Sequence, residues 1–274
     1  MNPTVSTQWL SQNLNDPNLI LLDASPESTI DGRKSEFHSM TIPGARLIDL
    51  EKDFSDTSSS LPHVLPSPEQ FETESRKLGI NTNSKIIVFD NLGIYTSPRF
   101  WWMFKTMGHE DVYVLDGGIP EWAARGNELG AKIEGNYPPG NFKARFQKDY
   151  LVSYEDVLRN ATDPSFTIVD ARSEGRFKGT SPEPRPHLKS GSIPNSVNIP
   201  FGEVLENGKF KSGAELKQIF ESTCGGTQNL VYSCGSGLTA CIILTAGEIA
   251  GRGSKKVYDG SWTEWAELQN LKVE

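Results

Sequence analysis

In this sequence of 274 residues, a series of short motifs in the first half occurs again, in the same order, in the second half. This internal repeat limits the folds that the chain can adopt. The first copy fills roughly the first half of the chain, and the second copy fills the rest. Near-constant separations across five landmarks indicate an internal duplication. The paired landmarks, 143 to 151 residues apart, are Asp23 with Asp170, Ile42 with Ile193, Asp90 with Cys234, Asp116 with Asp259, and Trp122 with Trp265.

Each copy alternates short apolar runs with amphipathic stretches. Runs such as 19–23, 85–90 and 167–170 predict buried strands. Strands that alternate with helices predict an α/β domain with a mainly parallel sheet flanked by helices. We therefore expect two tandem domains, 1–126 and 151–274. The stretch 127–150 between them is rich in Gly, Pro, Asn and Lys and predicts an extended linker.

Charge and composition exclude several classes of partner. The net charge of −8 argues against nucleic acid and anionic membranes, which attract basic surfaces. No run approaches the roughly 18 apolar residues of a membrane span, and the N-terminus lacks a signal-like pattern. Three cysteines without a C-x-x-C pair or histidines at ligand spacing favour a reducing compartment. We expect an intracellular protein with no metal and no cofactor.

The stretch around Cys234 carries the strongest chemical signal. Residues 230–233 read as a buried strand, and the apolar run after Thr239 reads as a helix that Thr239 caps. Gly235 and Gly237 permit a tight turn whose N–H groups converge on one point. A thiol at that point is favoured as the reactive thiolate, because the positive end of the helix faces it. The alternative is an ordinary buried cysteine.

Only the second copy has this chemistry. The corresponding turn of the first copy begins with Asp90 and contains no thiol, so that copy is predicted to be structural or to form a wall of a cleft. A tyrosine-phosphatase loop is excluded, because Cys-x5-Arg would place arginine six residues after Cys234, where Ala240 stands.

Several motifs together resemble the two-domain rhodanese superfamily, and most closely its 3-mercaptopyruvate sulfurtransferase branch. The thiosulfate-using branch usually carries Cys-Arg-Lys-Gly in the loop, whereas this chain has Gly235 and Ser236 at the two basic positions. That departure favours mercaptopyruvate as the sulfur donor. The motifs are Cys-Gly-Ser-Gly-Leu-Thr-Ala at 234–240, Asp-Gly-Ser-Trp-Thr-Glu-Trp at 259–265 and Gly-Arg-Phe-Lys-Gly-Thr at 175–180.

The resemblance implies a role for each matching residue. Cys234 is the nucleophile that becomes a persulfide, and main-chain N–H groups from Gly235 to Thr239 hold its charge. Arg176 and Arg185 grip the donor carboxylate; the alternative for either arginine is a solvated surface position or a salt bridge with Glu174 or Glu183. The implied substrate-binding positions are Arg176, Arg185, Gly235, Gly237, Leu238, Thr239 and Tyr95.

The resemblance also implies a proton relay. Ser236 and His63 match its hydroxyl and imidazole, and Glu51 matches its carboxylate, although Asp49 lies close by and leaves that position open. For His63 the alternative is an ordinary loop histidine.

The implied function is transfer of sulfur from 3-mercaptopyruvate to a thiol acceptor such as thioredoxin, or to cyanide, with release of pyruvate. A thiosulfate:cyanide sulfurtransferase and a non-catalytic rhodanese-like binding module are the alternatives. Similar proteins occur in the cytoplasm and the mitochondrion, and the N-terminus favours the cytoplasm. A redox role for Cys224 or Cys241 is left open.

Overall fold

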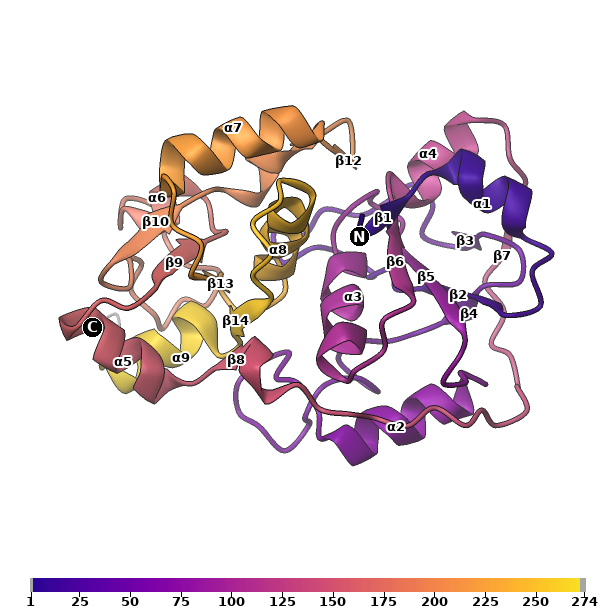
Figure 1. Cartoon of the computed structure of the whole chain (residues 1–274), viewed down its shortest axis with the longest axis horizontal. Helices are drawn as coiled ribbons and strands as arrows, with labels where there is room; N and C mark the ends of the chain where they lie inside the picture. The colour runs from indigo at the N-terminus through magenta and orange to yellow at the C-terminus, as the bar shows by residue number, and fades with distance from the viewer. Residues whose placement is uncertain (1, 272–274) are drawn as a thin grey trace. The chain divides into compact units, whose positions relative to one another are not determined.

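The computed structural model describes residues 2–271, and the chain divides into two compact units (Figure 1). Unit 1 consists of residues 1–58, 65–147 and 207–210, and unit 2 consists of residues 59–64, 148–206 and 211–274. Each unit therefore contains a short segment from the sequence of the other copy.

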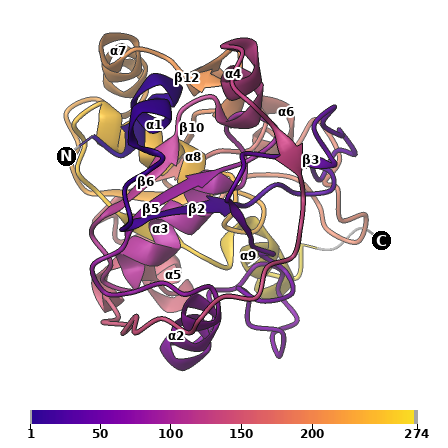
Figure 2. The ribbon, with the colours of Figure 1, turned by 90° about the vertical axis from the view of Figure 1, so that its right-hand side faces the viewer.

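A five-stranded parallel sheet in the order β1-β6-β5-β2-β4 forms the centre of unit 1. Helices α1 and α4 cover one face of this sheet, and α2 and α3 cover the other (Figure 2). The elements are β1 (Thr4–Val5), α1 (Thr7–Asn13), β2 (Leu19–Asp23), β4 (Arg46–Leu47), α2 (Pro68–Lys77), β5 (Lys85–Phe89), α3 (Ser97–Thr106), β6 (Val112–Leu115) and α4 (Gly118–Ala124).

The core of unit 1 follows from the apolar strands. From its second residue onward each of β2 and β5 is buried, as expected of central strands covered on both faces. Every residue of α3 is buried as well. Beneath α2 and α3, phenylalanine rings meet edge to face, with Phe71 and Phe104 4.9 Å apart between centroids.

Unit 2 has the same topology. Read from the opposite end, its parallel sheet is β8-β14-β13-β9-β10, so every strand takes the place of its counterpart in unit 1. This confirms the predicted pair of α/β domains with parallel sheets flanked by helices. The elements are β8 (Leu151–Val152), α5 (Tyr154–Thr162), β9 (Thr167–Asp170), α6 (Glu174–Phe177), β10 (Ser196–Asn198), α7 (Gly213–Cys224), β13 (Leu230–Ser233), α8 (Ala240–Ile249), β14 (Lys256–Tyr258) and α9 (Ser261–Leu268).

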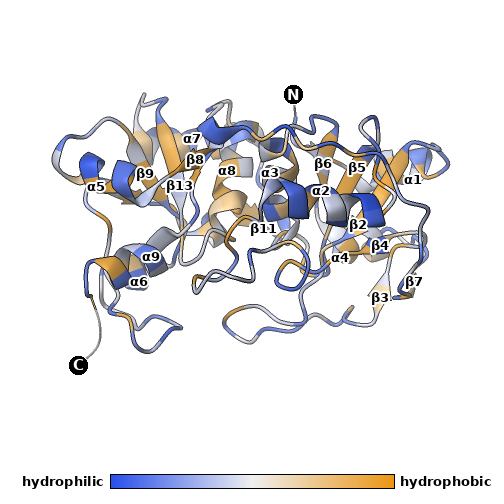
Figure 3. Cartoon of the chain, turned by 90° about the horizontal axis from the view of Figure 1, so that it is seen from below, coloured by the Kyte–Doolittle hydropathy of each residue, from blue (hydrophilic) through white to orange (hydrophobic). Residues whose placement is uncertain are grey.

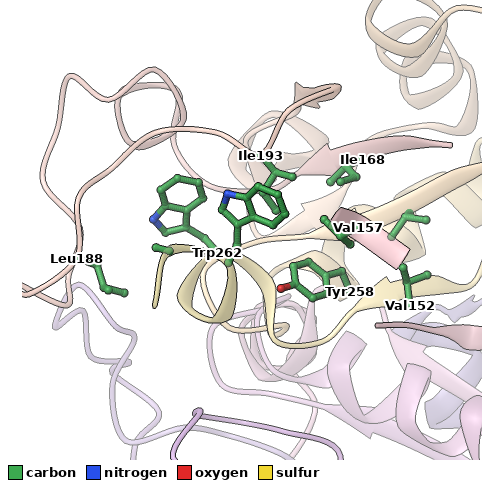
Figure 4. Packing of buried hydrophobic residues seen from close by; sticks show 10 residues of the cluster. Val152, Val157, Ile168, Leu188, Ile193, Tyr258 and Trp262 are labelled. Carbon is green, nitrogen blue, oxygen red and sulfur yellow. The ribbon is translucent and has the colours of Figure 1, made fainter. Parts of the chain in front are cut away.

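Two aromatic side chains dominate one face of the sheet in unit 2. Trp262 of α9 and Tyr258 of β14 are 1% exposed and pack with Val157 of α5 and Ile168 of β9 (Figure 4). The other face is covered by α7 and α8. The central strands are apolar and the outer faces of α2 and α5 are polar, as Figure 3 shows.

The remaining elements are short. Strands β3 (Met40–Thr41) and β7 (Gly130–Ala131) pair antiparallel, and β11 (Leu205–Glu206) and β12 (Lys209–Phe210) form a second pair. The 3-10 helices are η1 (Lys148–Tyr150) and η2 (Phe201–Val204). None of the helices between residues 2 and 271 has both the length and the apolar character that a bilayer crossing needs.

The segment predicted as a linker, 127–150, packs on unit 1 over residues 127–147. Its backbone is tied to the unit by hydrogen bonds: the Gly140 N–H donates to the Arg76 carbonyl (2.8 Å), and the Phe142 N–H donates to the Ile80 carbonyl (3.0 Å). A Cβ at Gly140 would lie 2.0 Å from the Ile80 oxygen, so only glycine permits this approach. Phe142 is 1% exposed and joins the phenylalanine cluster.

Phe142→Ala tests whether this segment supports the stability of unit 1. Loss of a buried ring should lower the free energy of unfolding by about 3–5 kcal/mol. Phe146→Ala is the matched control, because Phe146 lies in the same segment but is 42% exposed, and it should cost less than about 1 kcal/mol. Urea unfolding followed by tryptophan fluorescence measures both values. Equal costs for the two variants would contradict the prediction.

Candidate active site

Cys234 directly follows β13, the middle strand of the sheet in unit 2. It therefore stands at the carboxyl end of a central parallel strand, where open α/β sheets bind ligands. The loop 234–239, called here the Cys234 loop, leads into α8 at Ala240 (Figure 1). Cys234 is 2% exposed, so charge that develops on its sulfur depends on protein donors more than on bulk water.

The first turn of α9 fixes the direction of the Cys234 loop. The Trp262 N–H donates to the Cys234 carbonyl (3.0 Å), and the Thr263 N–H and hydroxyl donate to the Gly235 carbonyl (3.1 and 2.6 Å). These bonds hold the two carbonyl oxygens toward α9. The N–H groups that follow are thereby left to face elsewhere.

Ser261 ties the two ends of the turn together. Its Oγ accepts the N–H groups of Cys234 and Gly237, both at 3.1 Å, and donates to the Tyr258 carbonyl at 2.9 Å. The backbone of Ser261 is left-handed (φ 54°), a sparsely populated conformation for a side chain other than glycine. In the sequence this serine stands out only as part of the motif at 259–265, and no local pattern reveals its structural role.

Five main-chain donors of the loop and the start of α8 make no hydrogen bond within the described part of the chain. The predicted ring of donors from Gly235 to Thr239 is wrong at one position, because the Gly237 N–H donates to Ser261. No amide in this set donates to the Cys234 sulfur either, so the donors can serve a group bound beyond that sulfur. The five N–H groups belong to Gly235, Ser236, Leu238, Thr239 and Ala240.

The predicted cap at Thr239 is also wrong in its chemistry. Thr239 does occupy the N-cap position of α8, but its side chain makes no capping hydrogen bond. Its backbone is already helical (φ −72°, ψ −16°), whereas a side-chain cap needs an extended residue at this position. The first N–H groups of α8 therefore keep their donor capacity.

In the corresponding loop of unit 1, the carboxylate of Asp90 accepts main-chain N–H groups. Asp90 follows β5 as Cys234 follows β13, and it is fully buried. One carboxylate oxygen accepts the N–H groups of Tyr95, Thr96 and Ser97 at 2.9–3.0 Å, and the other accepts that of Leu92 at 3.0 Å. At the separation of 144 residues, Leu92, Tyr95 and Thr96 correspond to Ser236, Thr239 and Ala240. In unit 2, three of the four corresponding N–H groups have no such acceptor, whereas the Cys241 N–H, the counterpart of that of Ser97, donates to the Leu238 carbonyl (3.1 Å).

Arg176, on α6, lies against the Cys234 loop. A Cβ at Gly235 would stand 2.9 Å from the Arg176 Nη2 atom. Of the two alternatives for its ion pair, Glu183 is the partner (2.6 Å), whereas Glu174 pairs with Lys178. Arg176 is thus both ion-paired and adjacent to the loop.

Arg185 lies within electrostatic reach of the thiol. Burial lowers the pKa of its guanidinium, the positive charge of Arg176 lowers that pKa further, and a negative charge on Cys234 acts in the opposite direction. One guanidinium thus lies against the Cys234 loop and a second interacts electrostatically with Cys234, an arrangement suited to an anionic ligand.

His63 meets Ser236 in unit 2. Residues 59–64, called here the His63 strap, belong to this unit, and the ring Nδ1 lies 3.0 Å from the Ser236 Oγ. When the neutral ring carries its proton on Nε2, the hydroxyl donates to Nδ1. His63 has a left-handed backbone (φ 60°), a conformation that often marks functional segments.

Glu51, Asp49 and Tyr95 belong to unit 1. One Asp49 carboxylate oxygen accepts the N–H groups of Glu51 and Lys52 and so caps its own turn. Tyr95 is 5% exposed, and its hydroxyl accepts the Ile30 N–H at 3.3 Å. The roles proposed for Glu51 and Tyr95 stay predictions.

The other cysteines are held in nonreactive settings. The Cys241 thiol donates to the Gly237 carbonyl at 3.4 Å. Burial raises the pKa of Cys224 to about 11, so this thiol is protonated at neutral pH. Across residues 2–271, no group of three or more His, Cys, Asp or Glu side chains is placed to hold a metal ion.

The chain belongs to the rhodanese family, because the Rhodanese-like domain matches residues 6–125 and 153–268. It is 39% identical over 272 residues to the 3-mercaptopyruvate sulfurtransferase of Mus musculus, covering 95% of this chain and 91% of the relative. It is also 40% identical over 273 residues to the thiosulfate sulfurtransferase of Rattus norvegicus, with the same coverage. The crystal structure of the 3-mercaptopyruvate sulfotransferase SseA from Escherichia coli matches with a TM-score of 0.84 and 34% identity, covering 96% of this chain and 99% of that one. The family resemblance in the motifs is confirmed.

Ser261→Ala tests how the Cys234 loop is held. Two buried N–H groups would lose their acceptor, and the free energy of unfolding should fall by about 2–4 kcal/mol. Ser222→Ala is the control, since the exposed Ser222 hydroxyl only bonds back to its own helix, and it should change stability by less than about 0.5 kcal/mol. Urea unfolding gives both values. A Ser261 variant as stable as the control would show that the serine does not anchor the loop.

Proposed function

We propose that the chain is a sulfurtransferase that moves sulfur from 3-mercaptopyruvate, through a persulfide on Cys234, to a thiol acceptor or cyanide. The names of its relatives support the donor and the reaction class. The observation that carries the proposal is the set of unbonded amides around the thiol-bearing turn. Such donors are suited to an anionic outer sulfur.

The reaction has two steps. The Cys234 thiolate attacks the donor sulfur, the carbon–sulfur bond breaks, and its electron pair leaves as pyruvate enolate, which then takes a proton. The new S–S bond leaves a persulfide whose outer sulfur gives up the proton of the donor thiol and carries the negative charge. That proton balances the one that the enolate takes up. An acceptor thiolate or cyanide then attacks that sulfur, the S–S bond breaks, and the Cys234 thiolate is restored.

Arg176 and Arg185 are proposed to bind the donor. A planar guanidinium matches a carboxylate and a neighbouring keto oxygen through paired hydrogen bonds. The position of Arg176 against Gly235 and the electrostatic reach from Arg185 to Cys234 support this role. The overall negative charge of the chain makes such a local positive site necessary for an anionic donor.

Ser236 and His63 are proposed to deliver the proton to the departing enolate. Their 3.0 Å contact supports a relay in which the Ser236 hydroxyl passes its proton to the enolate and the His63 ring, with a proton on Nδ1, replaces it. Glu51 is the proposed carboxylate that orients His63, with Asp49 as the alternative. Tyr95 is the proposed contact with the donor from unit 1.

A persulfide experiment tests the proposal. After incubation with 3-mercaptopyruvate, peptide mass spectrometry should find one added sulfur on the peptide that contains Cys234. Cys234→Ser should lose the adduct and donor turnover, while Cys241→Ser, seven residues later, should keep both. Turnover by the Cys234→Ser variant would instead favour a binding module whose cysteine has no catalytic role.

Thiosulfate is the alternative donor, and the name of the rat relative favours it. The chain lacks basic side chains at positions 235 and 236, where the thiosulfate branch usually has them. We therefore expect kcat/KM to be at least about tenfold higher with 3-mercaptopyruvate than with thiosulfate. Steady-state assays with cyanide as a common acceptor measure the ratio, and a preference for thiosulfate would reverse the assignment.

The acceptor and the compartment are the finer parts of the proposal. A protein thiol such as thioredoxin is the proposed physiological acceptor, because a thiolate is a good nucleophile toward the outer sulfur. The cytoplasm is the proposed location, with the mitochondrion as the alternative.

A further inference from the structure

One buried carboxylate serves two arginines beside the Cys234 loop. The side chain of Glu183 is 2% exposed, and one of its oxygens accepts from Arg172 Nη1 at 2.9 Å. The other accepts from Arg176 Nη2 at 2.6 Å, and Arg176 Nε lies 3.2 Å from both. Glu183 therefore binds both the fully buried guanidinium of Arg172 and the guanidinium of Arg176, whose side chain is 17% exposed.

Arg172 is a fixed support for this carboxylate. Its guanidinium binds Asp170 at the end of β9 (2.6 Å) and the Gly191 carbonyl (2.7 Å), and it lies 4.4 Å from the centroid of the Trp262 ring. Burial opposes its charge, but the carboxylates of Asp170 and Glu183 outweigh that effect and raise the pKa of Arg172. A continuous set of ion pairs thus runs from the sheet through Arg172 and Glu183 to Arg176.

We propose that Glu183 is a positioning residue for the sulfur donor, and this inference rests on the proposed function. By holding Nε and Nη2 of Arg176, Glu183 fixes the plane of that guanidinium against Gly235. Within the described residues, Arg176 Nη1 donates to no protein group, so it is presented to the ligand. A long side chain fixed in this way loses less rotational freedom when the donor binds.

Glu183 can affect donor binding in two opposite ways, so the direction of the change in KM tests the proposal. A carboxylate near an anionic donor repels it, so removal of the charge alone would tighten binding. If positioning dominates, removal of the carboxylate loosens Arg176 and weakens binding. The two interpretations therefore predict changes of KM in opposite directions.

Glu183→Gln is the direct test. We expect KM for 3-mercaptopyruvate to rise about tenfold with a smaller change of kcat, because the guanidinium acts on donor binding. Glu174→Gln is the matched control: Glu174 lies on the same loop–helix segment but pairs with exposed Lys178, and its KM should stay at the wild-type value. A merely structural role would lower the melting temperature and the active fraction, which changes apparent kcat and leaves KM alone. A KM that is unchanged or lower in Glu183→Gln overturns the proposal.

A double-mutant cycle with Arg176→Met shows whether Glu183 acts through that arginine. In the Arg176→Met background, Glu183→Gln should give no further rise of KM. Additive effects in the cycle would overturn the proposal.

Glu183→Asp covers the case in which Glu183→Gln does not fold. It keeps the charge for Arg172 but withdraws the carboxylate by one methylene, so KM should rise by an intermediate factor. A wild-type KM in Glu183→Asp would count against the proposal. Failure of the proposed function itself is distinguishable, because the wild-type protein would then form no Cys234 persulfide with 3-mercaptopyruvate.

Discussion

The site depends on main-chain amides that have no acceptor of their own. A folded chain ordinarily pairs its buried N–H groups, so five neighbouring donors without a partner represent a free-energy cost that the rest of the structure must offset. Helix α9 makes this possible by donating hydrogen bonds to the carbonyl oxygens of Cys234 and Gly235. Because both carbonyl oxygens accept hydrogen bonds from α9, they do not serve as acceptors for the N–H groups of the loop.

The corresponding loops of the two units differ in what their main-chain N–H groups bind. In unit 1 the carboxylate of Asp90 accepts four main-chain N–H groups of its own loop. In unit 2 the corresponding residue is Cys234, whose shorter side chain accepts none of these main-chain N–H groups. The residue at the end of the middle strand therefore distinguishes a loop that binds its own carboxylate from one whose N–H groups have no acceptor in the loop. The loop of unit 1 can therefore be compared directly with the Cys234 loop.

Local sequence predicted the frame of this molecule well. The strands at 19–23 and 167–170 have the predicted bounds, because continuous apolar runs of this length favour central strands of a parallel sheet. The position of Cys234 followed from the same periodicity together with its glycines. The repeat predicted two copies of one α/β domain, and the matching strand orders of the two sheets agree with that prediction.

What the sequence could not predict depends on contacts between distant residues. The Gly237 N–H is taken by Ser261, 24 residues further along, and no local pattern reveals that bond. The role of Glu183 depends on two arginines that α6 and the end of β9 bring together. Phe142 stands in a stretch of turn-forming residues, yet its ring is buried in unit 1. In each case tertiary packing overrides a local preference.

Each unit contains a short segment from the other half of the sequence. His63 belongs with unit 2, and Asn207, its counterpart 144 residues on, belongs with unit 1; both have left-handed backbones. Gly208 of that second segment approaches Gly93 so closely that a methyl group at Gly93 would meet its oxygen at 2.4 Å. A cut at the midpoint of the chain would therefore separate each unit from a segment that packs with it, 59–64 from unit 2 and 207–210 from unit 1.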